Sequence, residues 1–169
     1  MTGTDKAATT VEAEYIKCVI RKGQKVTFKG ASYVVTKAPA SKAKGTVALV
    51  KAKNAKKFVV PASIRLKDNK VYNVTTLKAR SFTGRKLRTA VLGTSVKTIS
   101  KNTFKGSKVT KLIVKTKKLT KKSVKGSLKS SRIKKIYVKV GKKSVNRKYV
   151  KKYKKIFTKK NAGKAVKVK

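Results

Sequence analysis

Lysines recur at a fixed spacing in the second half of the chain, where they can hold an anionic polymer. Lys111 and Lys135 are 24 residues apart, as are Lys115 and Lys139, and Tyr137 lies between Lys135 and Lys139. Ammonium groups held in rows attract a chain of phosphate, sulfate or carboxylate groups, and a tyrosine ring offers a flat face for stacking on a sugar or a base. We therefore predict that these five residues bind a polyanion.

A recurring strand pattern positions these lysines. Leu87-x-x-Ala90-x-Leu92 returns as Val109-x-x-Leu112-x-Val114 and as Ile133-x-x-Ile136-x-Val138. If the last two apolar residues of each copy point inward, alternation along the strand turns the intervening residues outward. The outward residues then form three columns: Thr89, Lys111 and Lys135; Val91, Ile113 and Tyr137; Gly93, Lys115 and Lys139. This predicts an apolar stripe between two lysine rows, although the same face could be an ordinary sheet face covered by a loop.

A second repeated segment connects these strands. Residues 74–84 return as residues 96–106, at an interval of 22, with apolar, small, aromatic and glycine positions matching in order. A period of about 20–29 residues is typical of a solenoid, in which each repeat buries its apolar face against its neighbour. The third copy lacks the Phe and changes its spacing, as expected of a terminal repeat. Its apolar and glycine positions are kept by Leu119, Val124, Gly126 and Leu128.

The chain that precedes the repeats has a different pattern. Residues 1–10 are small and polar, which predicts a flexible tail. A β-branched run over 12–21 predicts a strand, and two β-rich runs over 25–29 and 32–36 flank a glycine turn, which predicts a hairpin. We expect residues 11–66 to form an antiparallel β module that caps one end of the solenoid.

A basic amphipathic helix is predicted after the repeats. Over residues 144–157, apolar side chains fall mostly three or four residues apart and lysines occupy most of the rest. Ser144 can cap the N-terminus of this helix. We expect the helix to cover the last repeat, with a short strand over 165–168 completing the region 143–169. The alternative is that the apolar face of the helix lies on an anionic membrane.

Together these patterns predict a mainly β protein. Its centre is a short leucine-rich-repeat solenoid of about three turns, with an N-terminal antiparallel β cap module and a C-terminal capping helix. The corresponding regions are a tail over 1–10, the cap module over 11–66, the repeats over 67–142, and the capping helix and strand over 143–169.

The charge of the chain is extreme. Its 169 residues include 50 Lys and Arg against 4 Asp and Glu, for a formal net charge of +46, and no acidic residue follows Asp68. Equivalent side chains on neighbouring strands lie about 5 Å apart, so lysine rows repel unless salt, anions or a polyanion screens them. Most of these cations are lysine, which favours diffuse attraction over the bidentate base recognition that arginine provides.

Residues needed for other kinds of site are missing from the sequence. There is no histidine, and the single cysteine, Cys18, is interpreted as a small apolar residue on a strand. Neither a catalytic carboxylate pair nor a glycine-rich nucleotide-binding motif occurs. We therefore expect no enzymatic activity, no metal and no cofactor. The 169 residues also contain no apolar run that is long enough for a signal peptide or a membrane span.

These motifs resemble the end of a bacterial BspA-like leucine-rich repeat protein, over residues 24–169. That family favours Ala-Phe-x-Gly, where this chain has Ser or Thr in place of Ala. The resemblance implies a secreted or cell-surface protein that takes part in adhesion and has no catalytic activity. It rests on Ser81-Phe82-Thr83-Gly84, Thr103-Phe104-Lys105-Gly106, the strands that begin at 87, 109 and 133, Val60-Pro61-Ala62, and the helix from Tyr149 to Phe157.

The resemblance and the charge lead to one functional expectation. We predict a noncatalytic extracellular adhesion or scaffold module whose partner is an anionic polymer, such as a glycan, mucin or teichoic acid, or an acidic protein at a cell surface. A nucleic-acid-binding protein that makes nonspecific phosphate contacts is the alternative. Membrane association through residues 144–157 is a further alternative that we do not expect. The oligomeric state does not follow from the sequence.

Overall fold

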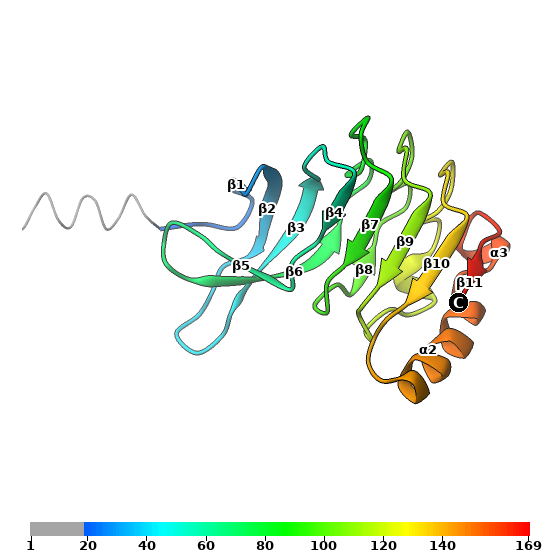
Figure 1. Cartoon of the computed structure of the whole chain (residues 1–169). Helices are drawn as coiled ribbons and strands as arrows, with labels where there is room; N and C mark the ends of the chain where they lie inside the picture. Colours follow the sequence, from blue (N-terminus) through cyan, green and yellow to red (C-terminus); the bar gives the residue numbers. More distant parts are fainter. Residues whose placement is uncertain (1–18) are drawn as a thin grey trace, which may run out of the picture.

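The computed structural model describes residues 19–169, whose strands form two β-sheets (Figure 1). Buried side chains fill the space between the sheets. The first sheet has the order β1 (Lys25–Phe28), β2 (Ala31–Lys37), β3 (Gly45–Lys51), β6 (Val71–Leu77) and β5 (Ser63–Arg65), with β8 (Thr98–Ile99) paired to β6. The second has the order β11 (Lys167–Val168), β10 (Lys135–Val138), β9 (Lys111–Val114), β7 (Thr89–Leu92) and β4 (Lys57–Val59).

The chain winds between the two sheets as a solenoid. It passes from β3 to β4, from β6 to β7 and from β8 to β9, and each pass stacks in parallel on the one before it. A single 3₁₀ turn, η1 (Lys122–Val124), precedes β10 in the last pass. The prediction of a mainly β solenoid with a C-terminal helix is confirmed, and the solenoid has about four turns instead of about three.

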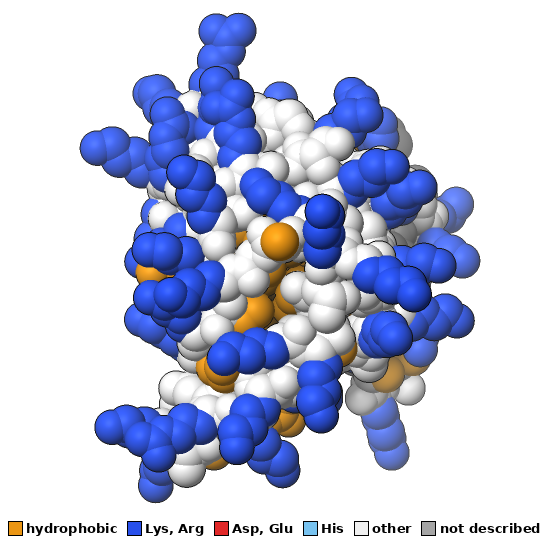
Figure 2. All heavy atoms as spheres, turned by 90° about the vertical axis from the view of Figure 1, so that its right-hand side faces the viewer, with side chains coloured by type: hydrophobic (Ala, Val, Ile, Leu, Met, Phe, Trp, Pro, Cys, Tyr) orange, Lys and Arg blue, Asp and Glu red, His pale blue; other side chains and the backbone are white. Residues whose placement is uncertain are grey.

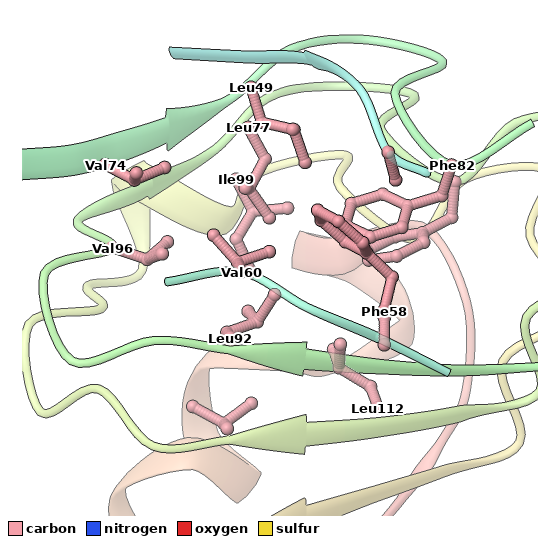
Figure 3. Close-up of a cluster of buried hydrophobic side chains, with 14 of the residues drawn as sticks. Leu49, Phe58, Val60, Val74, Leu77, Phe82, Leu92, Val96, Ile99 and Leu112 are labelled. Atoms are coloured by element: carbon pink, nitrogen blue, oxygen red, sulfur yellow. The ribbon is translucent and has the colours of Figure 1, made fainter. Parts of the chain in front are cut away.

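A column of aromatic rings runs along the axis of the solenoid (Figure 3). The ring of Phe82 stacks on that of Phe104, with centroids 4.9 Å apart, and meets the edge of Phe58 at 6.2 Å. Phe82 and Phe104 have no solvent exposure. The 22-residue period therefore has a direct packing cause, because it returns a ring to the same place in successive coils.

Backbone hydrogen bonds fix the register of the third repeat. The Arg80 N–H donates to Asn102 O, and the Asn102 N–H donates to Gly126 O. All three residues have positive φ, of 55°, 61° and 68°. Gly126 therefore occupies the position of Arg80 and Asn102. The prediction that it keeps the glycine position of the repeat, which is Gly106 in the second copy, was wrong. Leu128, two residues later, takes the place of Phe104 and keeps the 24-residue interval of the strands.

A small polar residue precedes the aromatic position in each repeat. Ser81, Thr103 and Ser127 are buried. The Thr103 hydroxyl donates to Ser100 O at 2.7 Å, whereas those of Ser81 and Ser127 find no hydrogen-bond partner within residues 19–169. A buried hydroxyl without a partner is destabilising, so alanine is physically better suited to Ser81 and Ser127.

We expect Ser81→Ala to raise the free energy of unfolding by about 1 kcal/mol, because the variant removes a buried hydroxyl that has no partner. Thr103→Val is the matched control, and it should lower the same quantity by about 1 kcal/mol because its hydroxyl is bonded. Urea unfolding of both variants measures the difference. A loss of stability in Ser81→Ala would contradict the assignment of that hydroxyl as unpaired.

The N-terminal part of the described chain is antiparallel. β1 pairs with β2 as the predicted hairpin, and β2 pairs with β3. β3 also pairs in parallel with β6, so the hairpin is continuous with the first coil. The division of the chain at residue 66 stays a prediction. Cys18, the tail over 1–10 and most of the strand expected over 12–21 lie outside the described residues, and Val19 to Arg21 form no strand.

Two helices and a short strand close the C-terminal end. α2 (Lys143–Ile156) is followed by α3 (Lys159–Ala162) and by β11, which pairs with β10. Tyr153 and Ile156 of α2 are buried, and the Tyr153 hydroxyl donates to Thr116 O. Burial also raises the pKa of Tyr153 well above its usual range. The apolar face of the helix thus covers the last coil, as expected.

The N-terminus of α2 differs from the prediction. Ser144 lies inside the helix, and Lys142 is the capping residue without a side-chain hydrogen bond. Asn146 is bonded to the preceding turn instead, since its Oδ1 accepts from the N–H groups of Val140 and Gly141, at 2.8 and 3.0 Å. Between residues 19 and 169, none of the helices has both the length and the apolar character needed to cross a bilayer.

Candidate anion-binding face

The lysines of the first predicted row lie side by side in the second sheet. In the parallel register, Thr89 lies opposite Lys111, and Lys111 lies opposite Lys135. The same row continues to Lys57 on β4 and to Lys167 on β11. All four lysines are exposed, so the row presents ammonium groups on every strand of the sheet except β7.

The second lysine row lies just beyond the ends of the strands. The Lys115 N–H donates to Leu92 O, and the Lys139 N–H donates to Val114 O, which continues the sheet by one residue. Both side chains are exposed. In the coil of β7 the corresponding residue is Gly93, so the row has no side chain there. A Cβ at Gly93 would lie 2.9 Å from Ala62 N and closer still to Val60 O, so glycine is needed for the backbones to pass.

The central column is less open than the sequence suggests. It contains Val59, Val91, Ile113 and Tyr137 in register. Val91 and Ile113 are only 2% and 8% exposed, whereas Val59 is 50% exposed and Tyr137 is half-buried. The apolar stripe is therefore accessible only toward its two ends.

A cation already occupies one face of Tyr137. The Lys111 ammonium lies 4.7 Å from the centroid of the tyrosine ring, which is within the range of a cation–π interaction. A sugar or base that stacks on this face must first displace Lys111. Tyr137 therefore positions Lys111 in the structure as it stands, and the predicted stacking role requires that contact to open.

Within residues 19–169, no acidic side chain lies in or beside the strands of this face. Asp68, at the turn between β5 and β6, is the one acidic residue between positions 19 and 169. Its two oxygens accept from the Tyr72 hydroxyl, at 2.6 Å, and from the Lys70 N–H, at 3.0 Å. Burial, together with the neighbouring Asp68, raises the pKa of Tyr72 well above its usual range. No acidic side chain between residues 19 and 169 therefore pairs with the lysine face, which we define as Lys111, Lys115, Lys135, Lys139 and Tyr137.

The crystal structure of the pneumococcal vaccine antigen PcpA is similar to this chain. The match covers 70% of this chain and 42% of that protein, with 21% sequence identity and a TM-score of 0.42. This chain thus spans less than half the length of PcpA. No family model and no curated protein matches the sequence, so membership of the BspA-like family stays a prediction.

A second group of lysines was missed in the sequence. They surround an open cavity of about 620 Å³ where the last coil meets the C-terminal helices. We call this the cap hollow, and it is lined by Lys121, Lys122, Lys125, Lys155, Thr158, Lys160 and Asn161. Figure 2 looks onto this end of the solenoid and shows Lys and Arg side chains all around it. No repeat pattern marks these lysines, because they come from two segments, around η1 and around the end of α2, that are about 35 positions apart.

Proposed function

We propose that this protein is a noncatalytic cell-surface module that binds anionic polymers such as glycans, mucin or teichoic acid. The observation that carries the proposal is the alignment of Lys111 with Lys135, and of Lys115 with Lys139, in two rows that no acidic side chain of residues 19–169 neutralises. Rows of ammonium groups at the spacing of β-strands, about 5 Å, suit a flexible polymer whose charges repeat at a similar distance. The surface location rests on the resemblance to BspA-like proteins.

The packing of α2 supports binding through the sheet over binding through this helix. Tyr153, Ile156 and Phe157 are buried against the last coil, so the most apolar side chains of the helix are not available to a bilayer. Lysines dominate what remains exposed on α2. Anionic membranes are therefore an outcome to be tested, and an anionic polymer is the partner we propose.

The test is replacement of Lys111, Lys115, Lys135 and Lys139 together with glutamine. We expect the affinity for a heparin-like glycan or teichoic acid at about 0.15 M salt to fall roughly 10- to 100-fold, since each exposed ion pair contributes about 0.2–1 kcal/mol. The dependence of affinity on salt should also weaken, because fewer counterions are released on binding. Titration over a range of salt concentrations measures both quantities.

The control removes the same charge from the exposed side of α2, with glutamine at Lys148, Lys151, Lys152 and Lys154. It should lower the affinity by less than threefold. Equal losses in the two variants would show that the polymer responds to total charge and that no face is involved. Tight binding to structured RNA or DNA that glycans and teichoic acid cannot displace would overturn the proposal in favour of a nucleic-acid partner.

A further inference from the structure

The lysines of the cap hollow come from two parts of the chain that the fold brings together. Lys121, Lys122 and Lys125 lie in and around η1, whereas Lys155 is near the end of α2 and Lys160 is in α3. All five side chains are exposed. Since no acidic residue follows Asp68, nothing in this half of the chain neutralises them. Five ammonium groups around one cavity repel each other unless an anion lies among them.

The walls of the hollow are held by hydrogen bonds across the two segments. The Asn161 side-chain amide donates to Lys121 O at 2.8 Å and to Ile156 O at 2.7 Å. The Gly126 N–H donates to Asn161 O at 2.8 Å, and the Leu128 N–H donates to Ala162 O at 2.8 Å. Asn161, which lies in α3, is thus bonded both to the segment around η1 and to the last residue of α2. The backbone that carries the lysines is therefore ordered before any ligand arrives, which lowers the entropy lost on binding.

From this convergence of charge on a braced backbone, we propose that the cap hollow binds a compact anion that carries several adjacent phosphate groups. A volume of about 620 Å³ lies within the range of small-ligand sites, about 300–1,000 Å³. Lysine binds phosphate as a point charge with rotatable donors. A terminal phosphate carries up to two negative charges, whereas a sulfate ester carries one, so phosphate neutralises five lysines with fewer groups.

This site goes beyond the proposed function, because it lies at the end of the solenoid and uses none of the residues of the lysine face. Its ligand can be a free oligophosphate or the phosphate-rich end of a polymer, since the chemistry of recognition is the same. The two sites also differ in the shape of the anion that they would bind. The lysine face is an extended row on regular strands, and the hollow is a single cluster around an open cavity.

The experiment is calorimetric titration with tripolyphosphate at about 0.15 M salt. We expect one ligand to bind each protein molecule with high affinity at the hollow. Replacing Lys121, Lys125 and Lys160 together with glutamine should weaken this binding at least tenfold. The matched control replaces Lys148, Lys151 and Lys152, which are exposed lysines of α2 outside the hollow, and should change the affinity less than threefold.

Three outcomes would overturn the inference: equal weakening in the two triple variants, several equivalent binding events for each protein molecule, or no saturable binding at all. A sulfated disaccharide serves as the second ligand, and binding as tight as that of tripolyphosphate would overturn the preference for phosphate. A terminally phosphorylated polymer that binds like tripolyphosphate would identify the polymer end as the source. The quadruple variant of the lysine face should retain tripolyphosphate binding, so failure of one proposal can be told from failure of the other.

Discussion

Phe82→Ala is expected to lower the free energy of unfolding by about 3–5 kcal/mol. Phe82 is fully buried and is the central ring of the aromatic column, with Phe104 stacked on one side and Phe58 at its edge. Truncation removes contacts in three successive coils at once and leaves a cavity that a closely packed interior cannot fill. Unfolding in guanidinium chloride, followed by circular dichroism, measures the change.

Phe82→Leu is the informative control. The third repeat already has a leucine, Leu128, at the equivalent position, and this residue is fully buried. The exchange should therefore lower stability by less than about 2 kcal/mol, since it keeps most of the apolar volume. A loss in Phe82→Ala no larger than in Phe82→Leu would show that the column does not hold the coils together.

Gly93→Ala should lower the free energy of unfolding by at least about 3 kcal/mol, at the upper end of the usual range for overpacking. The three atoms nearest to the added Cβ would be backbone atoms, of Val60, Pro61 and Ala62, and these cannot move aside as the end of a flexible side chain can. The first and second coils must separate locally to admit it. Thermal unfolding at several denaturant concentrations gives the free-energy change.

Gly141→Ala tests whether this effect comes from close approach and not from glycine as such. A Cβ at Gly141 would meet Val145 at 3.5 Å, an ordinary contact, and this glycine has no positive φ. The variant should change stability by less than about 1 kcal/mol. If the two alanine variants behaved alike, the tight passage between Gly93 and Val60-Pro61-Ala62 would not be a constraint on the fold.

The repeating part of the fold could be predicted because the apolar residues that set its period are the ones that pack in its core. A strand that returns every 22 or 24 residues with the same inward pair leaves one parallel register, so the neighbours of Lys111 follow from spacing alone. The first coil was harder to predict, since β3 and β4 carry no copy of the Phe-Gly segment. For this reason the predicted number of turns, about three, was too low by about one.

Three features of the structure could not be predicted from the sequence pattern. Alternation indicates on which side of the sheet Val91 and Ile113 lie, but it does not indicate that they are almost fully buried there. The start of α2 was misjudged because Ser144 is a good capping residue by type, whereas the turn before the helix is satisfied by Asn146. The cap hollow requires the turn between α2 and α3, whose path no local pattern specifies.

The short edge strand β11 limits the length of polymer that the proposed binding face could contact in one copy of this protein. It has two residues and ends the sheet beside β10, with Lys167 and Lys169 flanking Val168. Short, charged edges resist the addition of further strands, so the second sheet ends at β11. Five strands about 4.8 Å apart span roughly 20 Å, enough for about five charges of an extended chain. Strong attachment to a long polymer would then depend on several copies engaging the same chain, and it should rise steeply with their local density.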